Sequence, residues 1–402
     1  MASSLAVIII LGLLVDFIFK SIKVPGLIGM LLLGVIAGPY VLNLLSPGML
    51  NISSDLRIIA MIVILLRAGF GLSKDTLNKI GIKVLLLAFI PAAFEGITIT
   101  LLAPGFLHLT YIESAILAAI LSAVSLAVVV PQMIWFIEQK KGTKKGVPTL
   151  ILAASSMDNA FVIVIYSALI GMYIGKNISI AWKIASIPVC LGTGIGIGLI
   201  IGWVLYKFFE KYNPRATKRT LIILAISILL VKMDYLTGKT LPFTALLAVM
   251  AIGFIILEKR AHYAHELSKK LSKIWILAEI ILFTMVGSQV NIKIALDAGL
   301  SVIAMICLGL IARSIGSYLC LIKSNLNFKE KIFVVMSYLP KATVQAAFGG
   351  APLIAMRTAN MDTRPGEIIL AVAVLSIVIT APIGAWCIDY FGNKYLDIEN
   401  QE

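Results

Sequence analysis

The chain has 402 residues, of which 60% are hydrophobic and 13% are charged, and its mean hydropathy is +1.02. A composition this apolar excludes an ordinary soluble enzyme. The formal net charge of +14 does not indicate nucleic-acid binding, because Lys and Arg are concentrated in alternate loops between apolar segments, as orientation in a membrane requires.

Thirteen apolar segments are long enough, or nearly so, to span a bilayer as helices. They run roughly over residues 4–22, 25–43, 55–72, 82–104, 111–137, 146–174, 179–207, 218–236, 241–258, 272–290, 294–322, 331–354 and 366–391. Little of the chain lies between them, which leaves no room for a soluble catalytic domain. We therefore expect an all-α integral membrane protein of about 13 transmembrane helices, forming a single unit over residues 1–402.

Basic residues occur mainly in the loops that follow the odd-numbered segments. Four lysines lie between residues 140 and 145, after the fifth segment, whereas the loops around 44–54 and 105–110 contain no Lys or Arg. By the positive-inside rule, this alternation places the N-terminus outside and the C-terminus in the cytoplasm. The first segment lacks a preceding basic region, so we expect a retained helix rather than a cleaved signal peptide.

Two features repeat between segments that are seven apart in the chain. Segments four and eleven carry Glu95 and Arg313, and segments five and twelve contain Pro131 and Pro340. Seven is an odd number, so the two halves would have opposite orientations, and inverted repeats with interrupted helices are typical of secondary transporters. Alternatively, Pro131 only ends its helix and Pro340 makes an ordinary kink.

Four ionisable residues lie deep within the predicted helices. Counted from the nearest basic loop at the helical rise, Asp158 and Glu95 lie about 18 Å deep, and Arg313 and Lys341 about 15 Å. These depths are close to the centre of a hydrocarbon layer about 30 Å thick, where a charged side chain costs at least a few kcal/mol. Because the four residues fall near one level on four different helices, we predict that they form one site.

The chemistry of these residues separates their roles. Arg313 is always protonated and needs a permanent counter-ion, which is either Glu95 or Asp158. Lys341 lies beside a predicted helix break, where it either offsets the helix dipole ends or has a snorkelling or purely structural role. The three histidines lie in or beside loops, so a proton that crosses the membrane must be carried by a carboxylate. The four cysteines have no metal-like spacing, and we predict no cofactor.

Several strings in the chain point to one family. They are Leu65-Leu66-Arg67-Ala68-Gly69, the run from Ser122 to Pro131, the run from Gly146 to Leu150, the run from Asn327 to Ile332, Leu339-Pro340-Lys341-Ala342-Thr343-Val344-Gln345-Ala346-Ala347 and the run from Ile379 to Gly384. They resemble the monovalent cation/proton antiporter superfamily. The NHA-type (SLC9B-like) sodium/proton antiporters and their bacterial relatives are the most similar branch, and the likeness covers nearly the whole chain.

The resemblance implies a homodimer whose protomers exchange monovalent cations for protons. A scaffold of helices at about 1–72 and 218–290 would hold the dimer interface. A mobile core at about 82–174 and 294–391 would carry the ion in an elevator-like motion, and a helix at about 179–207 would link the two. Helices five and twelve would be the crossed, broken pair of an inverted repeat.

The same resemblance assigns the site residues. Glu95 and Arg313 match the family's core salt bridge, and Asp158 and Asn159 match the acidic pair that binds the ion. The predicted cation and proton site consists of Asp158, Asn159, Ser155 and Ser125, with Asp158 as the ligand of the monovalent cation. The predicted residues of the broken helices, which also offset their dipoles, are Lys341, Pro340, Pro131 and Thr343.

Two positions depart from the family pattern, because Asn159 replaces a second aspartate and Leu126 replaces the proline expected after Ser125. We therefore expect Asp158 to work alone, left free by a Glu95–Arg313 pair, and to exchange one Na⁺ or Li⁺ for one proton in an electroneutral cycle. K⁺ is a further candidate. The alternatives are a cation transporter without proton coupling and an inactive, regulatory or ion-site-substituted homologue.

A sodium-coupled organic-anion symporter is a minor alternative. An intramembrane enzyme is disfavoured, because the chain offers no buried histidine and no second aspartate near Asp158. The expected location is a bacterial plasma membrane, with membrane lipids and a second copy of the chain as partners and no nucleic acid.

Overall fold

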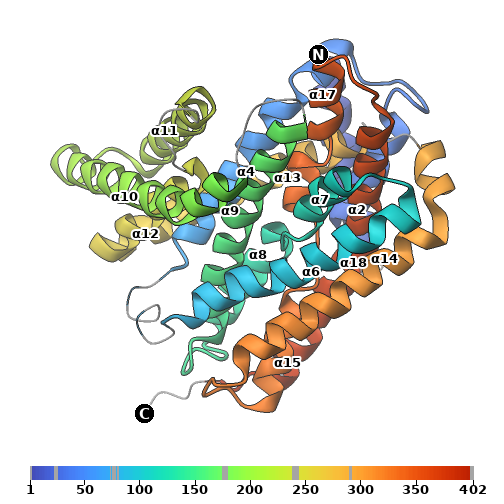
Figure 1. Cartoon of the computed structure of the whole chain (residues 1–402). Helices are drawn as coiled ribbons and strands as arrows, with labels where there is room; N and C mark the ends of the chain where they lie inside the picture. Colours follow the sequence, from blue (N-terminus) through green and yellow to red (C-terminus); the bar gives the residue numbers. More distant parts are fainter. Residues whose placement is uncertain are drawn as a thin grey trace.

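The computed structural model describes residues 2–21, 26–72, 74, 78, 81–173, 180–237, 244–288 and 292–398. Helices dominate these residues (Figure 1). In chain order they are α1 (Ala2–Ser21), α2 (Gly26–Ala37), α3 (Pro47–Asn51), α4 (Ser53–Gly69), α6 (Lys83–Leu107), α7 (Tyr111–Leu121), α8 (Leu126–Glu138), α9 (Val147–Tyr173), α10 (Ile180–Tyr212), α11 (Ala216–Thr237), α12 (Ala245–Lys259), α13 (Ala261–Gly287), α14 (Ile292–Leu321), α15 (Phe328–Ser337), α16 (Thr343–Phe348), α17 (Ala351–Thr358) and α18 (Arg364–Tyr395).

The apolar character of the helices supports a membrane protein, although it does not establish the predicted number of crossings. Every predicted apolar segment overlaps one helix or one interrupted helix. Within the described ranges, seven helical stretches are long and apolar enough to cross a membrane. They are Ala2–Ser21, Lys83–Leu107, Tyr111–Glu138, Val147–Tyr173, Leu191–Tyr212, Gly299–Leu321 and Arg364–Tyr395. The count of thirteen stays a prediction, because α2, α4 and α12 have only 12, 17 and 15 residues.

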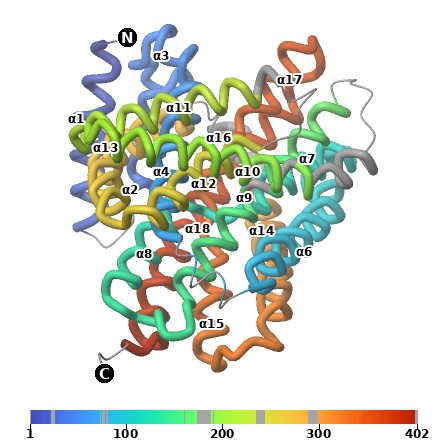
Figure 2. Tube along the Cα trace, turned by 90° about the vertical axis from the view of Figure 1, so that its left-hand side faces the viewer, coloured from blue at the N-terminus to red at the C-terminus, as the bar shows by residue number. Residues whose placement is uncertain are grey.

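The helices pack in two groups. The first contains α1, α2, α4, α11, α12 and α13, and the second contains α6 to α9 and α14 to α18. Within the second group, α6 and α14 lie side by side along much of their length (Figure 1). The long α10 packs on α12 and also contacts α9, and it crosses in front of the bundle beside α11 in Figure 2. The groups meet where α4 contacts α8, α9 and α16.

Glycines allow the helices of the first group to approach closely. A Cβ on Gly34 of α2 would clash with the carbonyl of Thr284 on α13, and a Cβ on Gly69 of α4 would clash with that of Met250 on α12. Small residues at such crossings are typical of membrane helices, because lipid offers no hydrophobic drive and association depends on close packing.

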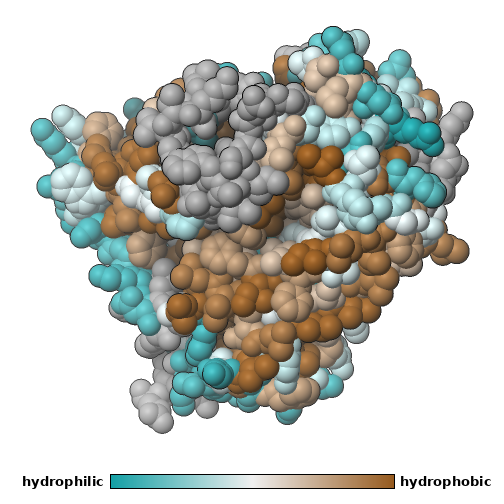
Figure 3. Space-filling view, in the orientation of Figure 1, coloured by the Kyte–Doolittle hydropathy of each residue, from teal (hydrophilic) through white to brown (hydrophobic). Residues whose placement is uncertain are grey.

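The outer surface of the second group is apolar. Figure 3 shows hydrophobic residues over the face formed by α6 and α14. Large side chains such as Leu101 on α6 and Leu300 and Ile311 on α14 are exposed there. A soluble protein rarely exposes a continuous apolar face of this kind, whereas a bilayer covers it.

Besides the kink at Gly299 in α14, the second group contains two helix breaks that lie in contact. The first break, at Ser122–Ser125, separates α7 from α8, and the second, at Tyr338–Ala342, separates α15 from α16. The amide of Ser125 donates to the carbonyl oxygen of Pro340 at 2.8 Å, so the two breaks touch each other. Pro340 lies in the second break. The prediction that Pro131 interrupts or ends its helix is wrong, because α8 runs through Pro131 and continues to Glu138.

Candidate ion-binding site

The centre of the candidate site is Arg313 of α14, a fully buried side chain. Its Nη1 donates to Glu95 Oε2 of α6 at 2.8 Å and to the carbonyl oxygen of Ser122 in the first break. Its Nη2 lies 3.2 Å from both carboxylate oxygens of Asp158 on α9. Arg313 therefore pairs with both acidic residues. The sequence predicted either Glu95 or Asp158 as its counter-ion, and the structure shows that both serve.

Lys341 completes the charged cluster from the second break. Its Nζ donates to Glu95 Oε2 at 2.6 Å, and the lysine is only 1% exposed. The snorkelling alternative for Lys341 is therefore wrong, because the ammonium points inward to a carboxylate. The backbone amide of Lys341 donates to Thr380 Oγ1 of α18 at 2.9 Å, which holds the unwound segment against that helix. The Glu95–Lys341 pair is surrounded by Ile99, Leu121, Ile306 and Ser376.

Asp158 is engaged rather than free in this conformation. Besides its contacts with Arg313, its Oδ2 accepts a hydrogen bond from the amide of Val124 in the first break at 2.9 Å. The expectation that a Glu95–Arg313 pair releases Asp158 is therefore wrong, because a guanidinium has enough donors to reach two carboxylates at once. Asp158 is 0% exposed, so all of its stabilisation comes from these protein groups.

The unwound backbone at the first break is bonded to side chains. The carbonyl oxygens of Ile120, Leu121 and Ala123 share the two N–H donors of Gln345 Nε2 of α16, at 2.9, 3.3 and 2.9 Å. The carbonyl oxygen between them, that of Ser122, accepts from Arg313. The end of a helix leaves carbonyls without intrahelical partners, and burying them is tolerated only when other donors reach them. Arg313 and Gln345 supply those donors here.

The hydroxyls of Ser125 and Thr343 both cap α8, the helix that leaves the first break. Ser125 Oγ accepts from the amide of Val128 in the first turn of α8 at 3.3 Å. Thr343 Oγ1 accepts from the amide of Ala127 at 3.3 Å and lies 3.5 Å from Ser125 Oγ. Both hydroxyls are fully buried. The two hydroxyls join the broken helices where these cross. Their hydrogen bonds go to α8 amides and to each other.

Asn159 and Ser155 lie next to Asp158 on α9. The amide oxygen of Asn159 is buried and accepts no hydrogen bond from the residues that the structure describes. Ser155 Oγ donates to the carbonyl oxygen of Leu152 one turn earlier in its own helix, at 3.2 Å. Asn159 Oδ1 is thus an unused neutral acceptor on the residue that follows Asp158, whereas the Ser155 hydroxyl bonds to its own helix.

Three contributors to the site were missed by reasoning from the sequence: Gln345, Thr380 and the backbone of residues 122–124. Gln345 stands in the same Leu339–Ala347 string that carries the family resemblance, and Thr380 stands in another. The available signal was a polar side chain inside an apolar segment, which is costly unless it has a partner.

The sequence of this chain is similar to those of known membrane proteins. The family model described as sodium/hydrogen exchanger, transmembrane, matches residues 5–388. Sodium/hydrogen exchanger 9B2 of Homo sapiens is 32% identical over 383 residues, covering 94% of this chain and 71% of the relative. Sodium/hydrogen exchanger 9B1 of Homo sapiens is 31% identical over 350 residues, covering 86% of this chain and 67% of the relative.

A solved structure shares the fold. The sodium proton antiporter MjNhaP1 of Methanocaldococcus jannaschii at pH 8 superposes with a TM-score of 0.82 and 21% sequence identity, covering 98% of each chain. The predicted resemblance is confirmed, and so is the all-helical antiporter fold. The relatives are exchangers, which need no cofactor and catalyse no covalent reaction. The chain is therefore an integral, multi-pass membrane transporter that belongs to the sodium/hydrogen exchanger family.

Proposed function

We propose that the chain exchanges Na⁺ or Li⁺ for protons across a membrane, and that Asp158 holds the cation and the proton in turn. The observation that carries this proposal is the placement of a fully buried carboxylate against an unwound helix, where Val124 and Arg313 bind it. An ionised carboxylate has about four lone-pair sites, and the described residues fill three. One site on Oδ1 is thus left for a cation, and the following residue of α9, Asn159, carries a further unused acceptor oxygen.

The charges of the cluster support one-for-one exchange. When all four groups are ionised, Glu95 and Asp158 balance Arg313 and Lys341, and the net charge is zero. Protonating Asp158 raises the net charge by one unit, and binding Na⁺ to ionised Asp158 raises it by the same amount. The two loaded forms therefore carry equal charge. A cycle that alternates between them moves no net charge across the membrane.

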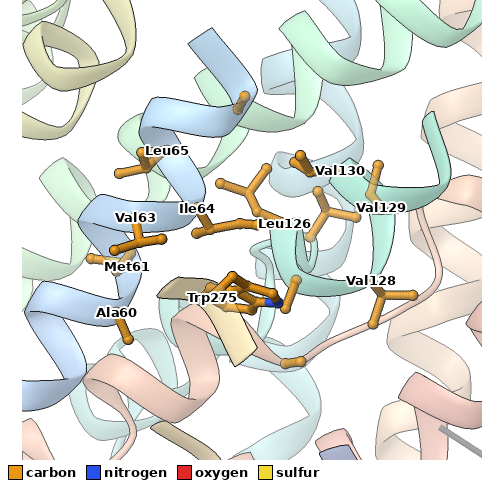
Figure 4. Close-up of a cluster of buried hydrophobic side chains, with 14 of the residues drawn as sticks. Ala60, Met61, Val63, Ile64, Leu65, Leu126, Val128, Val129, Val130 and Trp275 are labelled. Carbon is orange, nitrogen blue, oxygen red and sulfur yellow. The ribbon is translucent and has the colours of Figure 1, made fainter. Parts of the chain in front are cut away.

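The packing of the two helix groups supports movement of one against the other. Figure 4 shows Ile64 of α4 pointing toward Leu126 of α8 across an apolar contact, with Trp275 beside them. Apolar contacts are non-directional and tolerate sliding, whereas the hydrogen bond from Arg57 of α4 to the carbonyl oxygen of Ala346 on α16 must break in such a motion. We propose that α6 to α9 and α14 to α18 form the mobile core, that the first group forms the scaffold and dimer interface, and that their relative motion exposes Asp158 alternately to each side.

The test is cation-driven proton movement in proteoliposomes that contain a pH-sensitive dye. We expect Na⁺ or Li⁺ to release internal protons in the wild type, with K⁺ compared in parallel, and a clamped membrane potential to leave the initial rate unchanged. Asp158→Asn should abolish the signal. The matched control is Asp16→Asn, because Asp16 lies in α1 and pairs with Lys20 at 2.6 Å, away from the cluster. Exchange that survives Asp158→Asn would overturn the proposal.

The same assay separates the alternatives. Uptake of labelled Na⁺ without proton release would show an uncoupled cation transporter. Neither uptake nor proton release with any of the three cations would show an inactive homologue. A rate that follows the membrane potential would contradict one-for-one exchange but leave Asp158 as the carrier.

A further inference from the structure

The peptide unit between Ala123 and Val124 is held at both of its polar ends. Its carbonyl oxygen accepts from Gln345 Nε2 at 2.9 Å, and its N–H donates to Asp158 Oδ2, also at 2.9 Å. In a trans peptide the C=O and the N–H point in opposite directions, so the two contacts fix the rotation of the peptide plane between them. Gln345 is thus one peptide away from the carboxylate that we propose as the ion carrier.

Gln345 also gathers the neighbouring carbonyl groups. Its amide nitrogen lies within 3.3 Å of three carbonyl oxygens but has only two hydrogens to donate. The oxygens of Ile120, Leu121 and Ala123 therefore converge on one point at the end of α7. Gln345 lies on α16, and α16 contacts α7. The hydrogen bonds of Gln345 to these carbonyl oxygens therefore set the separation of the two broken helices at their crossing.

We propose that Gln345 is a positioning residue of the cation site, which acts by holding the Ala123–Val124 peptide and the carbonyl groups at the end of α7 in the orientation that Asp158 requires. The inference rests on the proposed exchange of cations at Asp158. Groups that orient the ligands of a metal ion typically change its affinity by about 10–100-fold when they are removed. Loss of Gln345 should act in this way, on cation affinity and on discrimination between cations.

The burial of Gln345 favours this role over simple packing. Its side chain is 0% exposed, and its Oε1 accepts no hydrogen bond from the described residues. The amide group therefore buries an acceptor that stays without a hydrogen bond. A buried acceptor without a hydrogen bond destabilises the folded protein. A residue needed only to fill space would be better replaced by an apolar side chain of the same length.

The test uses the full chain in proteoliposomes and compares Gln345→Met with Gln132→Met. Methionine keeps the length and most of the volume of glutamine but donates no hydrogen bond. Gln132 is a matched control, because it lies in α8, makes a single bond to the carbonyl oxygen of Ala385 at 3.3 Å and also has a buried Oε1 without a partner. The readouts are the KM and maximal rate of proton release for Na⁺ and for Li⁺, and the rise in unfolding temperature that each cation causes in detergent.

We expect Gln345→Met to raise the KM for Na⁺ by about tenfold or more and to change the Na⁺/Li⁺ ratio of KM values, while the maximal rate stays within about threefold of the wild type. Gln132→Met should leave the KM and the ratio as they are. Equal KM values and ratios in the two variants would overturn the proposal, as would a loss of maximal rate alone.

Two further measurements keep the inference separate from the proposed function. If the wild type binds Na⁺ but does not exchange it for protons, the exchange proposal fails, and the Na⁺-induced rise in unfolding temperature still decides whether Gln345→Met weakens binding. If Gln345→Met does not fold, Gln345→Asn replaces it, since it withdraws the amide by one methylene. Wild-type Na⁺ affinity in Gln345→Asn would then refute the positioning role, and an intermediate KM would support it.

Discussion

The shared carboxylate of Glu95 gives a prediction about stability that follows from the geometry of the cluster. Glu95 Oε2 accepts from Arg313 at 2.8 Å and from Lys341 at 2.6 Å. Two unit charges 2.6 Å apart attract each other by about 6 kcal/mol at an effective dielectric constant of about 20, and the loss of hydration offsets much of that attraction. Removing one partner of such a buried pair costs about 3–5 kcal/mol, mainly because the other charge is left uncompensated.

Glu95→Gln should therefore destabilise the protein by about 3–5 kcal/mol, whereas adding Lys341→Met should restore part of the loss. The reason is that the double variant keeps only Asp158 and Arg313, a neutral pair, whereas Glu95→Gln alone leaves an excess positive charge. At about 2 °C per kcal/mol for a large domain, Glu95→Gln lowers the unfolding temperature by roughly 6–10 °C. The double variant should unfold at a higher temperature than Glu95→Gln.

The assay is thermal unfolding of the purified chain in detergent, read as a double-mutant cycle. Arg260 and Glu210 provide a control cycle, because their bridge has a similar length of 2.7 Å but the two side chains are 54% and 43% exposed, and an exposed pair couples by no more than about 1 kcal/mol. If the effects of Glu95→Gln and Lys341→Met simply add, the two residues do not interact and the reasoning about a balanced cluster is refuted.

Three other substitutions test separate parts of the account. Asn159→Asp adds a second buried carboxylate, so exchange should become electrogenic, and a rate that still ignores the membrane potential would contradict the charge accounting. Arg57→Ala removes the buried guanidinium on α4 that donates to the carbonyl oxygen of Ala346 on α16 at 3.1 Å, and it should destabilise the protein by about 1.5–3 kcal/mol in thermal unfolding. Gly69→Ala should cost about 1–3 kcal/mol, because the added Cβ meets the Met250 carbonyl, whereas Gly105→Ala in α6 has open space and should be neutral in the same measurement.

The depth of a residue in the membrane could be predicted from the sequence, but the direction in which its side chain points from the helix could not. Counting residues from the basic loops brought Asp158, Glu95, Arg313 and Lys341 to one level, and the structure brings all four into one cluster. Helical rise gives a position along the helix axis but not the rotation of the helix about that axis. For this reason the sequence left Arg313 with two possible partners, and the structure shows that it contacts both.

The position of the first helix break could not be predicted from the sequence either. Proline suggested a break near Pro131, but the chain unwinds at Ser122–Ser125, where no proline is present. The unwound carbonyls are stabilised by Arg313 and Gln345, which lie about 190 and 225 residues further along the chain. A local pattern cannot reveal donors that arrive by tertiary packing. In the second break, Pro340 is itself part of the unwound segment, and the local signal was sufficient.

The central claim is that one carboxylate, Asp158, holds either a proton or a cation. The most direct measurement is the number of protons released when Na⁺ binds to the purified protein, obtained by titration calorimetry in buffers with different ionisation enthalpies. At a pH where Asp158 carries its proton, the account predicts close to one proton released per Na⁺ bound by the wild type, and neither binding nor release by Asp158→Asn. Na⁺ binding that releases no proton, or release that persists in Asp158→Asn, would contradict it.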